Sequence, residues 1–175
     1  APFSASTYEA AFVRPLARFY AATLGREVSA AHFVELEESF QAKYVALLAG
    51  CSLASDAREA LTTWHADGGT QSLLSLWGHA QLVRYVERFG LTDYFHRIDG
   101  RRVPDVTTKA GPLREHLAAL ASTREVVLIG DALDDAAAAA DVGVRCVMYA
   151  GGTHDVGRLT KTGNPVAHTL IEAIA

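Results

Sequence analysis

Cysteine is scarce in this sequence, and long apolar runs are absent from it. The two cysteines, Cys51 and Cys146, lie far apart and outside any Cys-x-x-Cys pattern, so we expect no disulfide framework and a reduced, cytoplasmic setting. No apolar run approaches the roughly 20 residues that a membrane helix needs. No basic stretch followed by an apolar one opens the chain as a signal peptide would. Because the chain does not start with methionine, we expect it to be processed or cut.

Neither sign of charge dominates the sequence. Its net charge is −4, with 16 basic and 20 acidic residues, and no basic block or stripe indicates a nucleic-acid partner. Half of the 175 residues are hydrophobic and 21% are charged, a balance that predicts a packed core and not disorder. This length allows one core with a smaller subdomain attached. The seven histidines include no His-Glu-x-x-His or other metal-binding spacing.

The first third of the chain has the texture of helices. Ser6 followed by Glu9 has the spacing of a capping box, and Gly25 is placed to end the helix that follows. Pro15 lies inside this pattern and predicts a kink or a split into two helices. Ser29 is a candidate cap for a second helix that stops near residue 50. Four phenylalanines at helical spacing are predicted core residues: Phe12, Phe19, Phe33 and Phe40.

The last two thirds of the chain alternate strand and helix patterns. Such alternation predicts an α/β fold, a Rossmann-like parallel sheet covered by helices. Residues 125–129 are apolar and rich in β-branched side chains, which is typical of a strand buried on both faces. The tail from residue 156 to residue 174 is predicted to hold one or two short helices around Pro165. Strands are predicted at 71–76, 94–98, 125–129 and 144–149, and helices at 55–65, 78–89, 109–120 and 131–142.

Polar side chains follow the predicted strands at the points where ligands bind in such sheets. Within the first predicted strand, residues 71–74 run into Ser75. Lys109 opens a helix, and the sequence Gly130-Asp131-Ala132-Leu133-Asp134-Asp135 follows the strand at 125–129. Ligands of open α/β sheets bind beyond the carboxyl ends of the strands. These residues are therefore the candidate site.

Together these residues resemble the second, third and fourth motifs of the haloacid dehalogenase superfamily. A hydroxyl residue after one strand, a lysine at a later helix start, and Gly-Asp-x-x-x-Asp after the next strand stand in the order that the family uses. The segment 89–95 (FGLTDYF) is similar to the connection between the second and third strands of the phosphoglycolate-phosphatase-like members. The resemblance covers residues 56–150 well.

The resemblance implies a chemistry for each residue. In this family an aspartate attacks phosphorus and forms an aspartyl-phosphate, which water hydrolyses. Ser75 would donate a hydrogen bond to a phosphoryl oxygen, and Lys109 would supply a positive charge to the phosphate and the nucleophile. Asp131 would bind Mg²⁺. Asp135 would hold a metal-bound water or orient Lys109, although Asp134 is an alternative for that role.

The resemblance also implies two domains and a substrate class. Residues 1–55 have the length and texture of a helical cap, which in this family closes over the site and selects the substrate. Residues 56–175 correspond to the α/β core. The expected substrate is a small phosphorylated metabolite, with no nucleic acid and no membrane as partner. Trp77 is expected to line the same mouth as Ser75 and to contact the substrate, although a packing role is the more ordinary one for a tryptophan.

The first motif of the family, Asp-x-Asp-Gly-Thr, is missing from the sequence. Asp67-Gly68-Gly69-Thr70 lacks the preceding Asp-x and stands before a strand, not after one. In the family this motif ends the central strand and carries the nucleophile. We therefore expect a segment upstream of Ala1 or on a companion chain. A degenerate, non-catalytic member and a shifted strand assignment are the other two explanations.

Simpler roles and other functions compete with this interpretation. Ser75 suits a turn, Lys109 a solvated surface and Asp131 a helix cap, while His154 suits a surface loop and Cys146 a small apolar core position. A 2-haloacid dehalogenase or a phosphosugar mutase would use a related scaffold. Dehalogenation needs no metal, so the paired carboxylates after the strand argue against it. A non-catalytic binding module on the same scaffold would explain the missing motif.

Overall fold

The computed structural model describes residues 4, 7–8, 11–13, 15–103, 108–121 and 125–175. The chain divides into two compact units, Ala1–Ser52 and Leu53–Ala175, close to the boundary predicted at residue 55. The role of the first unit as a cap stays a prediction. In the described residues, no helix combines the length and the apolar character that crossing a membrane requires.

The first unit contains the helices α2 (Leu16–Leu24) and α3 (Ala30–Leu48). Pro15 stands directly before α2, where its missing N–H costs no helical hydrogen bond, so the split predicted at this proline lies at the start of α2. Gly25 ends α2 with a positive φ of 64°, which glycine adopts without a steric cost. The hydroxyl of Ser29 accepts a hydrogen bond from the backbone N–H of His32 at 3.3 Å and so caps α3. The capping box predicted from Ser6 to Glu9 lies outside the described residues.

The predicted core of the first unit is only partly correct. Phe12 and Phe19 are each 8% exposed, with ring centroids 5.7 Å apart, and Phe33 is half-buried. Phe40 is 40% exposed and stacks on Tyr44, which is itself exposed. The prediction that Phe40 is a core residue is therefore wrong. Helical spacing put it on one face of α3, but that helix buries none of its described side chains.

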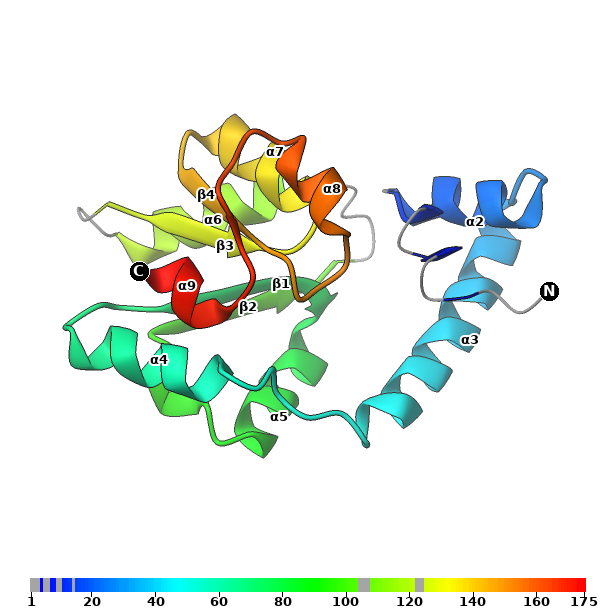
Figure 1. Cartoon of the computed structure of the whole chain (residues 1–175). Coiled ribbons are helices and arrows are strands. Elements are labelled where there is room, and N and C mark those ends of the chain that lie inside the picture. The colour runs from blue at the N-terminus through cyan, green and yellow to red at the C-terminus, as the bar shows by residue number, and fades with distance from the viewer. Residues whose placement is uncertain (1–3, 5–6, 9–10, 14, 104–107, 122–124) are drawn as a thin grey trace. The chain divides into compact units, whose positions relative to one another are not determined.

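The second unit is the predicted α/β fold, with helices on both sides of its strands (Figure 1). Strands and helices alternate through most of its length, and its paired strands are parallel. The elements are α4 (Ala57–Ala66), β1 (Ser72–Gly78), α5 (His79–Arg88), η1 (Thr92–Tyr94), β2 (Arg97–Arg101), α6 (Ala110–Leu120), β3 (Val127–Gly130), α7 (Leu133–Val142), β4 (Arg145–Tyr149), α8 (Val156–Thr160), β5 (Val166–Ala167) and α9 (Leu170–Ile174).

The strands form two sheets in the described part of the chain. One sheet contains β1 and β2, and the other has the order β3-β4-β5. Helix α6 packs on β1 and β2, its neighbour α7 packs on β3 and β4, and the two helices pack on each other. Helix α5 packs on β1 and β2, and α9 packs on β4 and β5. The carboxyl ends of the parallel strands within each sheet therefore open toward one edge, where the polar residues of the predicted site follow.

Three strand predictions need correction. The strand predicted at 94–98 begins only at Arg97, because Thr92–Tyr94 forms a 3₁₀ turn. The short strand β5 was not predicted, since two residues carry too little pattern. Strand β3 is not buried on both faces, because Val127 is 38% and Ile129 is 36% exposed. Its only partner among the described residues is β4, which leaves its other edge open. That a further strand belongs beside this edge stays a prediction.

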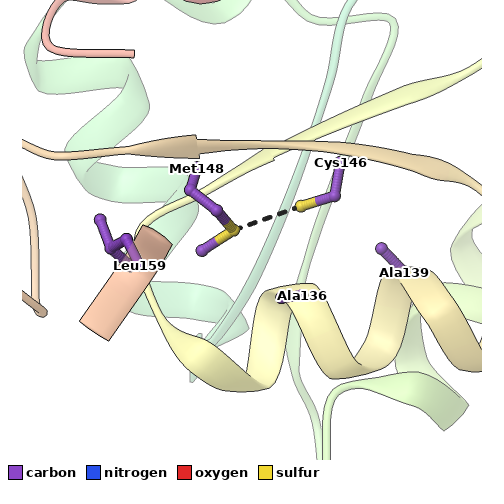
Figure 2. Packing of buried hydrophobic residues seen from close by; sticks show 5 residues of the cluster. All are labelled: Ala136, Ala139, Cys146, Met148 and Leu159. Atoms are coloured by element: carbon purple, nitrogen blue, oxygen red, sulfur yellow. Dashed lines mark hydrogen bonds between the residues drawn. The ribbon is translucent and has the colours of Figure 1, made fainter. Parts of the chain in front are cut away.

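The core of the second sheet lies between β4, α7 and α8. Met148 and Leu159 have no exposed surface, and the short side chains of α7 allow the helix to approach the strand closely. The Cys146 thiol donates a hydrogen bond to the Met148 thioether at 3.5 Å (Figure 2). The prediction that Cys146 is a small core residue is confirmed, with 5% of its surface exposed. Figure 2 shows the five residues of this cluster: Ala136, Ala139, Cys146, Met148 and Leu159.

The two cysteines are expected to differ sharply in reactivity. Burial, with a smaller contribution from the Asp135 carboxylate, raises the pKa of the Cys146 thiol to about 11, so about 0.1% of it is thiolate at pH 8. Cys51 is exposed. Iodoacetamide at pH 8 should therefore alkylate Cys51 and leave Cys146 intact in the folded chain, as measured by peptide mass spectrometry. Both should react in guanidinium, and equal rates in the folded chain would contradict the buried placement.

Candidate active site

The loop between β3 and α7 is organised by one buried carboxylate. Asp135 is 2% exposed, and its Oδ2 accepts hydrogen bonds from the backbone N–H groups of Asp131 and Ala132, both at 3.0 Å. The Ala132 N–H stands at the cap of α7, where a helix start leaves donors without an intrahelical partner. A negative charge is also favoured near a helix N-terminus. Asp135 therefore fixes the backbone on which Asp131 stands.

The second oxygen of the same carboxylate holds Lys109. The Lys109 ammonium donates to Asp135 Oδ1 at 2.5 Å, and the lysine side chain is only 13% exposed. Lys109 precedes α6, and Asp135 lies in the first turn of α7. The ion pair thus joins the starts of two helices that pack on each other. Of the two carboxylates proposed for this role, Asp135 is the one that contacts Lys109 in the structure.

Asp131 is held from the loop that follows β4. Its Oδ2 accepts hydrogen bonds from both the backbone N–H and the hydroxyl of Thr153, each at 2.7 Å. The sequence analysis missed Thr153. The signal that was available is a hydroxyl residue directly after Gly151 and Gly152, beyond the end of a strand.

Two glycines allow these contacts by their lack of a side chain. A Cβ at Gly130 would lie 2.4 Å from the Asp135 Cβ, and a Cβ at Gly152 would lie 2.2 Å from Asp131 Oδ2. Both distances are far below van der Waals contact. The aspartates therefore occupy space that only glycine leaves open.

Ser75 and Trp77 lie within β1 of the other sheet, and His79 directly follows that strand. The Ser75 hydroxyl accepts a hydrogen bond from the backbone N–H of Trp77 at 3.1 Å, in a stretch where the pairing of β1 with β2 is irregular. The Trp77 ring packs against Tyr85 with centroids 5.3 Å apart. His79 Nδ1 accepts from the backbone N–H of Gly100 at 3.1 Å and so ties the end of β1 to β2.

The structure groups three of the predicted site residues and places the other two in a different sheet. Lys109, Asp131 and Asp135 meet at the start of α7. The strand that was predicted to run into Ser75 continues to Gly78, so Ser75 and Trp77 lie within β1 of the other sheet and not beyond its end. The roles assigned to these five residues stay predictions. His154 is 4% exposed, so the prediction of a surface loop is wrong for it. The turn after Gly151 folds this side chain inward.

A hollow of about 300 Å³ lies beside Asp131. Its lining includes the glycines on both sides of the site, the side chain of Tyr149 and Leu170 of α9. Its lining residues are Ile129, Gly130, Asp131, Tyr149, Gly152 and Leu170.

The described residues could supply only part of the coordination shell of a magnesium ion. No group of three or more histidine, cysteine or acidic side chains gathers in the described part of the chain. Both oxygens of Asp135 are occupied by Lys109 and by backbone N–H groups. Asp131 Oδ1 remains available. Mg²⁺ is commonly bound by one or two carboxylates, with waters and substrate phosphates completing its shell, so Asp131 suits it as one ligand.

The fold and these contacts define an α/β protein with a candidate ligand site at the carboxyl ends of its strands. Residues 109–173 match the family model described as HAD-hydrolase-like. The comparison with curated proteins found no match. The fold is that of the haloacid dehalogenase superfamily, and residues 109–173 carry the sequence pattern of its hydrolases, which confirms the resemblance found in the sequence.

Solved structures share this fold. A haloacid dehalogenase-like family hydrolase from Streptococcus pneumoniae is similar, with a TM-score of 0.81 and 16% identity over 99% of this chain and 81% of that chain. A predicted phosphoglycolate phosphatase from Haemophilus somnus has a TM-score of 0.73 and 14% identity over 90% of this chain and 72% of that one. A protein from Thermotoga maritima, provisionally described as a beta-phosphoglucomutase, has a TM-score of 0.66 and 14% identity over 90% and 74%. At these identities the likeness establishes the fold.

Adding one methyl group at Gly130 should dismantle the site. In the Gly130→Ala variant the new Cβ would force Asp135 away from its two N–H donors and from Lys109, leaving a buried ion pair broken. Breaking a buried pair costs about 3–5 kcal/mol, which urea unfolding would measure.

Gly111→Ala is the matched control for this variant. Gly111 lies in α6, and a Cβ there meets nothing within 4 Å, so alanine should stabilise the helix by about 0.5–1 kcal/mol. Equal effects of the two substitutions would contradict the packing described here.

Proposed function

We propose that this chain carries the phosphate-binding and cation-binding residues of a phosphomonoester hydrolase that acts on a small phosphorylated metabolite, with Mg²⁺ as its cation and an aspartyl-phosphate as its intermediate. The observation that carries the proposal is the buried Lys109–Asp135 pair beside Asp131. An ammonium group has three N–H donors, and Asp135 accepts one of them. The other two N–H donors of Lys109, on a positive charge that is fixed in place, suit a phosphoryl group. The negative charge of that group must be balanced in the transition state.

Ser75 has a donor to offer to the same group. Its oxygen accepts from Trp77, so the hydroxyl hydrogen stays available for a phosphoryl oxygen. The backbone contact fixes the oxygen and leaves the O–H direction adjustable. This supports a role for Ser75 as a hydrogen-bond donor to the phosphate, and a role for Trp77 as a neighbour that shapes the opening of the site.

Asp131 supports the metal role better than Asp135 does. Two hydrogen bonds from Thr153 fix Asp131 Oδ2 and leave Oδ1 for a cation, whereas Asp135 has no oxygen left. A bound Mg²⁺ would neutralise phosphoryl charge and orient the substrate. Asp135 then acts by holding Lys109 and by fixing the backbone of Asp131.

The nucleophile has to come from a further carboxylate. Asp135 is fully engaged, and Asp131 is committed to the cation, so an aspartyl-phosphate needs the first motif of the family, which the printed sequence lacks. The same lack favours a second candidate function, in which the chain binds Mg²⁺ and phosphate without turnover. The names of the solved relatives, a phosphatase and a phosphomutase of small molecules, support the substrate class in either case. In both, residues 1–55 are the proposed cap that selects the substrate.

Hydrolysis of 4-nitrophenyl phosphate by the full chain, with and without Mg²⁺, tests the proposal. If the chain is the proposed enzyme, Asp131→Asn should lower kcat/KM about 10²–10³-fold, because one cation ligand and its charge are lost. Asp141→Asn is the matched control, since Asp141 is exposed and pairs with Arg114 at the far end of α7. Turnover that persists in EDTA or in Asp131→Asn would overturn the hydrolase proposal.

Calorimetric titration separates the two candidate functions. Mg²⁺ and inorganic phosphate that bind to the wild type, and bind more weakly to Asp131→Asn, without any hydrolysis would establish the binding function. Hydrolysis together with such binding would establish the enzyme. If the chain shows neither binding nor hydrolysis, both functions are excluded for this polypeptide.

A further inference from the structure

A second polar cluster, outside the proposed site, lies under α6. His116 is 3% exposed, and its ring contacts Asp99 Oδ2 through Nδ1 at 2.6 Å and the Ser72 hydroxyl through Nε2 at 2.9 Å. Ser72 begins β1 and Asp99 lies in the middle of β2. One histidine of the helix therefore contacts both strands of the first sheet.

The hydrogen positions in this cluster follow from the charge of Asp99. Burial would raise the pKa of Asp99, but hydrogen bonds from Arg97 and His116 outweigh it and lower the pKa below its ordinary value. An ionised carboxylate only accepts hydrogen bonds, so His116 Nδ1 carries a hydrogen. When His116 is neutral, its Nε2 accepts from the Ser72 hydroxyl, and when it is charged, the same hydroxyl accepts instead. The contact between helix and strand is thus kept in both protonation states.

The cluster is not a second hydrolytic site, although serine, histidine and aspartate are in contact. A serine nucleophile needs access to substrate and an oxyanion site, whereas His116 is enclosed. Ser72 also lies at the amino end of β1, opposite the edge at which the proposed site opens. The cluster therefore acts through other residues.

Spacing along the two elements connects this cluster to the proposed site. His116 follows Lys109 by seven residues, two turns of helix, so the two positions lie on the same side of α6 and are separated by about 10.5 Å along its axis. Ser72 precedes Ser75 by three residues, about 10 Å of strand. The contacts of His116 with Ser72 and Asp99 therefore fix α6 two turns beyond Lys109.

We propose that His116 is a positioning residue, which anchors α6 to β1 through Ser72 and to β2 through Asp99 and thereby fixes Lys109 at the start of that helix. The catalytic consequence of this position of Lys109 rests on the proposed function. The position itself can be tested without any turnover. The Lys109 ammonium is then held by Asp135. The Lys109 backbone is held, through α6, by the Ser72–His116–Asp99 cluster.

Competitive acetylation with acetic anhydride tests the placement. The three lysines of the sequence are Lys43, Lys109 and Lys161, and the first and last are exposed, so they serve as internal references in the mass spectrum. Ser72→Val and Ser72→Thr have side chains of equal shape that differ in one hydroxyl. Ser72→Val should raise the relative labelling rate of Lys109 about tenfold, since one hydrogen bond that holds the helix closed is lost. Ser72→Thr should keep the wild-type rate.

His116→Ala should raise the labelling of Lys109 at least as much as Ser72→Val does. The effect of the double variant should be smaller than the sum of the two single effects, because both substitutions remove the same contact between His116 and Ser72. Leu159→Ala controls for general loss of stability, since Leu159 is fully buried under the other sheet. Lys109 labelling that is unchanged in Ser72→Val, or raised equally in Leu159→Ala, would overturn the proposal.

Turnover distinguishes the two proposals. If the chain hydrolyses 4-nitrophenyl phosphate, Ser72→Val should lower kcat about tenfold with little change in KM, and Ser72→Thr should restore it. An unchanged kcat would refute the positioning role. If no variant and no wild type hydrolyses, the proposed function fails while the labelling still decides whether His116 fixes Lys109.

Discussion

The buried carboxylate of Asp135 is the interaction on which the rest of this site depends. One oxygen binds the backbone of the loop after β3, and the other binds Lys109 at the start of α6. A charge with 2% exposure is costly unless it is paired and hydrogen-bonded, and here each oxygen has a donor. The cost of burying the charge is offset only while the loop, α7 and α6 keep their relative places, so Asp135 couples three segments into one unit.

Close approach of backbone to side chain is the second constraint. Gly130 and Gly152 leave room for Asp135 and Asp131, and the alanines of α7 let that helix settle on β4, where Met148 and Leu159 fill the space that remains. The site and the core thus both depend on the same short helix. Small residues on α7 serve both, because a larger side chain would push the helix and its first-turn carboxylate away together.

Much of this arrangement is predictable from sequence where a local rule decides it. The glycine at residue 25, the serine cap at residue 29 and the order of strands and helices in the second unit follow from local patterns, and the fold class follows from that order. The rest depends on contacts between distant segments. Thr153, His116 and Asp99 carry no motif, because their roles arise only when loops and strands far apart in the chain come together. Phe40 shows the converse, since its helical spacing is correct but it stacks on an exposed tyrosine and remains 40% exposed itself.

The open edge of β3 has a practical consequence for handling the protein. In the described residues this strand pairs only with β4, and Val127 and Ile129 remain more than a third exposed. A strand with free backbone groups and β-branched side chains is a template on which another chain can add a strand. We therefore expect concentrated solutions of this polypeptide to self-associate at β3 first. A lysine at position 127 would improve solubility without touching the aspartates at the other end of the strand.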